Sequence, residues 1–356
     1  MIATRIAKEL LSRGGAEITV IAEGLSVEEW RKANLPVRIY DEGPLKIDEP
    51  WDITPSAVFL DTKPDVLMTG LSSPIRSEEI FIDADYRNGF NVPVVVLDDN
   101  WGAVNRCRFP ADLVLTIDEL GRRLIQECTA YAHHNYQVVV VGDLSATVSA
   151  KSVADKTKTD FSKAVVGADY SFILLSQKWQ ESEDVISTAL AVCAVSVQVG
   201  KKIAIVPRFH PGASEEDKKK WNGSVANFER QFPGTVRWFE GCDSDSLATL
   251  ADGIFAATGS GLRAAAYAGK IPICVWSPHL SEKLQGESGT KHHPLVLGGA
   301  ALQVTLGQTL DVVGEIEGRQ EEIQSTQKKL LRPVPFDVQV AADAVVKAAK
   351  AFRFYK

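Results

Sequence analysis

The stretch that most constrains the fold of this chain runs from Asp252 to Pro272, with the sequence DGIFAATGSGLRAAAYAGKIP. It is typical of a short buried strand, a tight turn of glycine and serine, and a helix of small residues that ends at Gly269. A second strand follows from Ile271. A helix that begins in such a turn leaves its first backbone N–H groups free and directs its positive dipole end to one place. The pattern therefore predicts an α/β unit with a capacity for anions.

Four residues of this turn are the predicted phosphate site. Gly259 and Gly261 allow a diphosphate to approach the backbone closely, and the hydroxyls of Thr258 and Ser260 can donate hydrogen bonds to its oxygens. An ordinary β–α turn without a ligand has the same pattern, so that alternative stays open.

Apolar strands alternate with helices along the rest of the chain. The strand runs are continuously apolar, which indicates parallel strands covered on both faces. The predicted fold class is therefore α/β, with two doubly wound Rossmann-like domains. We place them at residues 1–143 and 144–335, with residues 336–356 as a final amphipathic helix. Residues 235–239 are expected to form a strand, and residues 278–294 a polar loop.

The start of the chain departs from this pattern. Residues 1–11 already predict a helix, and residues 18–22 a strand. A doubly wound sheet normally has a strand and a glycine-rich turn before such a helix. The first strand of the N-terminal domain is therefore missing. Either the sequence begins late, which we favour, or the sheet lacks a central strand.

Composition excludes several classes of protein. The 356 residues are 45% hydrophobic and 24% charged, which is typical of a soluble globular protein. No apolar run approaches the roughly 20 residues of a membrane span, and a net charge of −7 argues against nucleic-acid binding. The five cysteines are scattered without a CxxC pair, which predicts a reducing, cytoplasmic location and no structural zinc. The adjacent pairs His133-His134 and His292-His293 make poor metal sites, so we expect no metal and no cofactor.

Three segments together carry a resemblance to a known family. They are the early helix and strand within residues 2–21, the turn Arg208-Phe209-His210-Pro211-Gly212, and residues 251–272. The chain resembles the GT-B proteins, which include nucleotide-sugar glycosyltransferases and UDP-N-acetylglucosamine 2-epimerases. The resemblance covers nearly the whole chain and implies that the terminal helix packs back on the first domain.

The same resemblance implies roles for individual residues. Arg208 and His210 would face the donor diphosphate, at the carboxyl end of a buried strand where α/β proteins bind ligands. The residues alone allow another interpretation, in which Arg208 caps a neighbouring helix and His210 belongs to a surface turn. In such families an acidic residue five positions before the helix-ending glycine binds the ribose. Ala264 stands at that position here.

The first domain offers two candidate clusters for the acceptor. Ser72 and Ser73 follow a strand, and Glu78 and Glu79 open the next helix. Acidic residues in a first helical turn also simply favour the helix dipole, with Ser77 as the N-cap, and this explanation needs no substrate.

The second cluster is Asp98-Asp99-Asn100-Trp101, at the end of the strand over residues 94–97. Asn100 and Trp101 could hold a sugar through hydrogen bonds and an apolar ring face. Asp98 or Asp99 is the first choice for a general base, with Glu78 or Glu79 next. A turn stabilised by hydrogen bonds from the aspartate side chains explains the cluster equally well.

The sequence therefore favours a glycosyltransferase that moves a sugar from a nucleotide-sugar, UDP- or GDP-linked, to a carbohydrate or glycan acceptor. No metal would be needed, because the helix end and basic side chains stabilise the leaving diphosphate. One alternative is an enzyme like the UDP-N-acetylglucosamine 2-epimerases. Another is a binding subunit without catalysis of its own. A homodimer remains an open alternative for the assembled state.

Overall fold

The computed structural model describes residues 2–22, 25–35, 37–39, 55–71, 77–99, 101–107, 111–127, 135–144, 153–176, 179–209, 213–331 and 335–353. The chain divides into two compact units. The first comprises Met1–Ile117, Gly121–Leu144 and Phe336–Lys356, and the second comprises Asp118–Leu120 and Ser145–Pro335.

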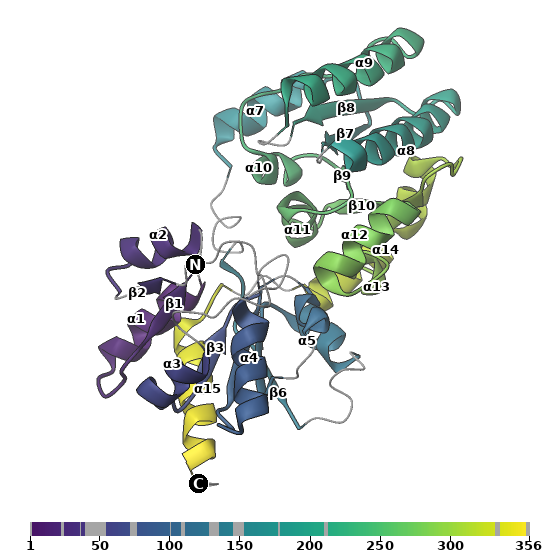
Figure 1. Cartoon of the computed structure of the whole chain (residues 1–356). Helices are drawn as coiled ribbons and strands as arrows, with labels where there is room; N and C mark the ends of the chain where they lie inside the picture. Colours follow the sequence, from purple (N-terminus) through teal and green to yellow (C-terminus); the bar gives the residue numbers. More distant parts are fainter. Residues whose placement is uncertain are drawn as a thin grey trace. The chain divides into compact units, whose positions relative to one another are not determined.

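The first unit contains two parallel sheets (Figure 1). The smaller one pairs β1 (Val20–Ala22) with β2 (Val37–Ile39), and the larger one has the order β3-β4-β5-β6. The strands of the larger sheet are β3 (Leu67–Thr69), β4 (Val94–Asp98), β5 (Leu113–Thr116) and β6 (Gln137–Val140). The helices are α1 (Ile2–Ser12), α2 (Leu25–Lys32), α3 (Pro55–Thr62), α4 (Ser77–Asn88), most of α5 (Glu119–Gln126) and α15 (Val338–Arg353), with a 3-10 turn η1 (Ala103–Arg106).

Both faces of the four-stranded sheet are covered, as its apolar strands require. Val95 and Leu97 of β4 point towards α1 and α15, where Ile6 and Val345 are buried. The alternate residues of the same strand belong to the opposite core, with side chains of α4 and α5. Helices α1 and α15 also contact each other through Arg13, whose guanidinium donates to Asp343 at 2.5 Å.

No described strand joins the two sheets of the first unit. Side chains of β1 and β3 share one apolar cluster, with Ile21 and Leu67 packed around Val58 and Phe59 of α3. All three residues of β3 are half-buried, whereas every residue of β4 and β5 is buried. Among the described residues of this unit, no strand lies before α1 and none connects β1 to β3.

The second unit is built on one parallel sheet of order β11-β10-β9-β7-β8. Its strands are β7 (Tyr170–Leu175), β8 (Ile203–Arg208), β9 (Gly253–Ala256), β10 (Ile271–Trp276) and β11 (Leu302–Thr305). Its helices are α7 (Asp155–Ala164), α8 (Trp179–Gln198), α9 (Glu215–Gln231), α10 (Ser244–Ala248), α11 (Ser260–Tyr267), α12 (Pro278–Ser288), α13 (Pro294–Leu297) and α14 (Val312–Leu330).

A single bridge completes the topology of this sheet. Val236 pairs in parallel with Ile205 on the outer side of β8. Numbering the pairing segments along the chain then gives the order 3-2-1-4-5-6 of a Rossmann sheet. The strand order reverses between β7 and β9. In such sheets ligands bind beyond the carboxyl ends of the strands at this switch point.

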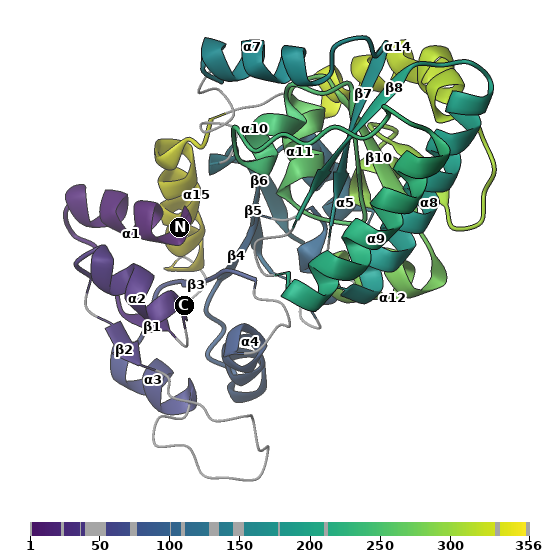
Figure 2. The ribbon, with the colours of Figure 1, turned by 90° about the horizontal axis from the view of Figure 1, so that it is seen from above.

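Helices cover both faces of the second sheet (Figure 2). Helices α8, α9 and α14 bury their apolar residues against one face, in a core that includes Phe172, Phe255 and Trp221. Helices α10 and α11 lie on the other face, where α11 packs near Ile254 and Leu175. Phe255 and Ile254 face opposite sides because side chains alternate along a strand.

Two expected elements of the second unit are wrong. The strand predicted over residues 235–239 is reduced to the bridge at Val236, where Ile205 of β8 accepts from the backbone N–H of Arg237 at 2.8 Å and donates to Thr235 at 2.9 Å. The loop predicted over residues 278–294 contains α12 and α13. Each of these helices begins with a proline at its first position and a side-chain cap, from Ser277 and His293 respectively.

Candidate functional site

The turn between β9 and α11 lies at the switch point of the second sheet. We call residues 258–261 the α11 turn. Gly259 is the N-cap of α11 with φ +113° and ψ 167°, and its conformation is strained for any residue with a side chain. As a glycine, Gly259 supplies no side-chain cap for the helix. A Cβ on Gly259 would meet no atom within 4 Å, so the surface above the turn is open.

Gly261 has a different role in the same turn. A Cβ on this residue would lie 3.0 Å from Ile254 Cδ1 and 3.5 Å from Leu175 Cδ2. The glycine therefore lets the first turn of α11 lie directly on β7 and β9. Thr258 is half-buried and Ser260 is exposed. The four residues predicted as the phosphate site are thus neighbours in one turn, with free helix N–H groups as expected for any uncapped N-terminus.

A carboxylate that the sequence analysis missed lies beside this turn. Ser260 Oγ donates a hydrogen bond of 2.8 Å to Asp245 Oδ1, from α10. Asp245 Oδ1 also lies 3.9 Å from the Cβ position of Gly261. A negative charge at a helix N-terminus is favourable, and it would also repel an incoming diphosphate. Only the tertiary packing of α10 on α11 brings Asp245 here, so no local pattern could have revealed it.

Arg208 holds the loop that leads to α10. Its guanidinium donates to the backbone carbonyls of Phe239 at 3.0 Å and Cys242 at 2.6 Å. Two N–H groups of the half-buried side chain are thereby used within the protein. In the described contacts Arg208 therefore fixes the loop that leads to α10. The residues alone had suggested that it caps a helix. His210 lies outside the described residues.

The position of Ala264 carries no acid, as the sequence shows, and the residue is buried in α11. At the start of α11 the nearby carboxylate is instead that of Asp245, which accepts the hydrogen bond from Ser260. The charge pattern around the start of α11 therefore differs from the one that the resemblance implies.

Ser277, directly after β10, has a structural role. Its hydroxyl accepts from the backbone N–H of Leu280 and donates to Asp184 Oδ2 at 2.5 Å. Sequence reasoning passed over Ser277, although a serine before proline at a strand end signals a helix cap.

The described histidine pair is divided between two structural roles. His292 stacks on Trp276 and its Nδ1 lies 2.8 Å from Gln303 Oε1. His293 is buried, and its Nδ1 accepts from the backbone N–H of Leu295. Burial lowers the pKa of His293 to about 4. Within the described ranges no group of three or more His, Cys, Asp and Glu side chains could hold a metal ion.

The candidate acids of the first unit differ in their exposure. Asp98 ends β4 opposite Thr116 and is 0% exposed, whereas the next residue, Asp99, is exposed. Trp101 is 4% exposed, so its ring lies within the protein and does not offer a face to a sugar. This differs from the aromatic surface that the sequence suggested. Asn100 lies outside the described residues.

The other predicted cluster of the first unit, which comprises Ser72, Ser73, Glu78 and Glu79, is only partly described. Glu79 in the first turn of α4 is half-buried. The side chain of Glu78, together with Ser72 and Ser73, lies outside the described residues.

Comparisons with known proteins identify the fold. No protein-family model matches the chain, and no curated protein matches its sequence. Solved structures do match over nearly its whole length. A glycosyltransferase from Rickettsia africae has a TM-score of 0.56 at 13% identity, covering 99% of this chain and 93% of that one. The chain has the GT-B fold.

Two further GT-B structures are similar to the same extent. MnaA of S. aureus, in a structure with UDP, has a TM-score of 0.54 at 13% identity, covering 99% of this chain and 93% of that one. A UDP-N-acetylglucosamine 2-epimerase has a TM-score of 0.52 at 12% identity, covering 99% and 92%. None of the helices described for this GT-B chain is long and apolar enough to cross a membrane.

Proposed function

We propose that this chain is a glycosyltransferase that holds the diphosphate of a nucleotide-sugar at the α11 turn and transfers the sugar to a carbohydrate or glycan acceptor. The observation that carries the proposal is the uncapped, open N-terminus of α11 at the switch point of a Rossmann sheet. The GT-B fold supports it, as does the similarity to a structure that contains UDP.

In this proposal the second unit binds the donor. The first N–H groups of α11 and the hydroxyls of Thr258 and Ser260 contact the β-phosphate and stabilise the charge that develops on it as the sugar leaves. Arg208 keeps α10 in place through the Phe239 and Cys242 carbonyls. His210 remains a candidate donor to the leaving phosphate. The transfer needs neither a metal nor another cofactor.

The first unit supplies the acceptor side, with Ser72, Ser73 and Asn100 as candidate contacts. Asp99 is the better candidate general base of the two neighbouring aspartates, because its side chain is exposed and that of Asp98 is fully buried. A base must reach the hydroxyl proton that it removes. Glu78 and Glu79 are the next candidates.

Two observations favour a second candidate function. Asp245 beside the α11 turn would repel a diphosphate, and Ala264 cannot bind the ribose as an acidic residue would. Both features weaken the case for binding of a nucleotide-sugar. A GT-B binding subunit without catalysis would tolerate both features. An epimerase activity stays a further alternative, since an epimerase is among the similar structures.

The test is a donor screen with the intact protein, in the presence of EDTA. UDP- and GDP-sugars are supplied with a mixed acceptor pool, and both the released nucleoside diphosphate and the sugar products are measured. We expect release with one donor and a new glycoside. Conversion of a UDP-sugar to its 2-epimer without release would identify the epimerase. UDP binding without turnover of any donor would favour the binding subunit.

A further inference from the structure

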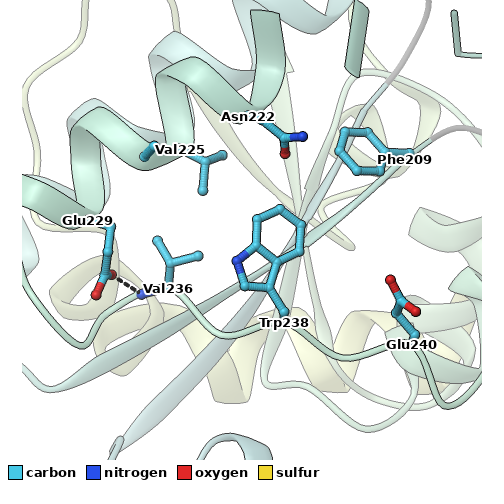
Figure 3. Close-up of a pocket in the computed structure, with 8 residues that line it drawn as sticks. Phe209, Asn222, Val225, Glu229, Val236, Trp238 and Glu240 are labelled. Atoms are coloured by element: carbon cyan, nitrogen blue, oxygen red, sulfur yellow. Dashed lines mark hydrogen bonds between the residues drawn. The ribbon is translucent and has the colours of Figure 1, made fainter. Parts of the chain in front are cut away.

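An open hollow of about 620 Å³ lies beside α9 (Figure 3). Helix α9 covers the face of the second sheet opposite to α11. The hollow lies between α9 and the segment that follows Val236. We call it the Trp238 pocket. Its lining includes Phe209, Asn222, Val225, Val236, Trp238 and Glu240. Its volume falls within the range of about 300–1,000 Å³ that is typical of small-molecule sites.

The pocket lies beside the segment that was expected to form a strand over residues 235–239. Val236 makes one bridge to β8, and the chain beyond it leaves the sheet. Trp238 then presents its indole to solvent, with 54% of the residue exposed. An exposed tryptophan in a concave surface is uncommon, because its large apolar face gains most from burial.

Aromatic packing fixes the position of this indole. Phe209 stacks against Trp238, with ring centroids 6.4 Å apart and planes at 27°. On its other side, Phe209 meets the buried Trp221 of α9 edge-on, at 6.4 Å. The exposed ring is therefore linked to the core through Phe209, and we call its open face the platform.

The platform faces away from the α11 turn. Arg208 and Phe209 are consecutive, and so are Trp238 and Phe239. Arg208 bonds to carbonyls of the loop that leads to α10, and Phe239 packs edge-on against Phe161 of α7. Phe209 and Trp238 instead meet on the α9 side (Figure 3). The pocket is thus a separate site, and its existence does not depend on the proposed function of the α11 turn.

Two polar groups at the pocket are available to a ligand. Asn222 and Glu240 are both exposed, and neither has a hydrogen bond or ion pair within the residues described here. Glu229 also lines the pocket, but both of its oxygens are used. They accept from the backbone N–H groups of Gly234 at 2.5 Å and Val236 at 2.7 Å, and so fix the turn.

We propose that the Trp238 pocket binds a neutral saccharide of one or two pyranose rings. The C–H face of a pyranose is apolar and flat enough to lie on the indole, while its equatorial hydroxyls need donors and acceptors at the rim. Asn222 offers both, and Glu240 accepts. The lining contains two glutamates and no basic residue, which disfavours phosphorylated or acidic sugars.

Among the described residues around the pocket, the charges leave Glu240 as the one acidic group open to a ligand. The charge of Glu229 is already stabilised by two backbone N–H groups. Lys218 lies one helical turn before Asn222, and its charge is paired with that of Glu215. Glu240 can accept a hydrogen bond from a sugar hydroxyl, and choline and arginine serve as the cationic controls for this choice of ligand.

The experiment titrates the full chain with methyl glucosides, methyl galactosides, methyl N-acetylglucosaminides and cellobiose, up to about 20 mM. Binding is followed by tryptophan fluorescence and by saturation-transfer difference NMR. We expect saturable binding of at least one saccharide, with the C–H face of one ring receiving the strongest transfer. Trp238→Ala should weaken it at least tenfold, whereas Trp238→Phe, which keeps an aromatic platform, should change it less than about threefold.

Asn222→Ala should weaken binding severalfold, and Leu297→Ala, at another exposed apolar residue, should have no effect. Thermal melting checks that each variant is folded. Four results would overturn the proposal: no saturable binding of any saccharide, binding unchanged in Trp238→Ala, binding equally weakened in Leu297→Ala, or binding of choline or arginine in place of saccharides.

Discussion

The two units use the same alternation of strands and helices, but their sheets differ. The second sheet is continuous, and the bridge at Val236 completes the Rossmann order around the β7–β9 switch point. The first is divided between β1–β2 and β3–β6, and β3 stays half-buried. A complete switch point carries the open helix N-terminus, whereas the candidate acids of the divided unit lie at the end of β4 and in the first turn of α4. Under the proposed function, the complete sheet would provide the binding and the divided unit the chemistry.

The largest expected effect is on turnover, and it tests whether the first unit supplies the general base. Asp99→Asn should lower turnover by roughly 10²–10⁴-fold, because it removes a general base, and should leave UDP affinity unchanged. Steady-state rates with the active donor and calorimetric titration with UDP measure the two effects. The matched change Glu79→Gln separates the two acidic clusters. If Asp99→Asn retains full turnover and Glu79→Gln does not, the base lies in α4 and the assignment of Asp99 is wrong.

A pH titration distinguishes the stability of the second unit from that of the first. His293 is neutral when folded, with a pKa of about 4, and its ordinary pKa when unfolded is about 6.5. The free energy of unfolding is therefore highest above pH 6.5 and decreases as the pH falls towards 4, because the folded state resists protonation of His293. The loss is about 1.4 kcal/mol per pH unit and about 3 kcal/mol in total.

Hydrogen exchange at α13 and β11, compared with β4 and β5, measures this loss region by region. His293→Asn keeps a capping oxygen and should remove the extra slope. If the exchange of His293→Asn depends on pH in the same way as that of the wild-type protein, His293 is not the titrating group.

The next effect concerns binding alone. Ser260→Asp places a second carboxylate in the α11 turn and should weaken UDP binding at least about 100-fold, while the helix N-terminus tolerates the acid. Calorimetry measures the affinity and circular dichroism checks the fold. Ser260→Ala, which removes only one hydroxyl, should weaken binding severalfold. UDP binding of normal strength in a folded Ser260→Asp protein would reduce the turn to a structural element.

The smallest effect has the opposite sign. Asp245→Asn removes a like charge beside the proposed phosphate position but keeps an acceptor for Ser260, so UDP should bind about fivefold more tightly. Asp169→Asn makes the same charge change before β7, at the other end of the sheet, and should alter the affinity much less. Equal effects of the two variants would show a general charge effect, and weaker binding in Asp245→Asn would show that the carboxylate contacts the ligand.

The sequence predicted what depends on local pattern. The apolar strands and the α11 turn followed from periodicity, glycine placement and the order of elements. The proximity of Asp245 to Ser260 could not be predicted, because the two residues belong to different helices. The bracing contacts of Arg208 and the burial of Trp101 also depend on packing. The exposed Trp238 arises because a segment with strand-like residues leaves the sheet after one bridge.

Hydrogen exchange with and without saturating UDP tests the central claim most directly, because it reports which backbone N–H groups the nucleotide covers. We predict that protection increases most at residues 258–264, where the diphosphate would accept hydrogen bonds from the start of α11. The amides of β1 and β2 should change little. UDP binding with protection confined to another segment, or a folded protein that shows no change at residues 258–264 with millimolar UDP, would contradict the account.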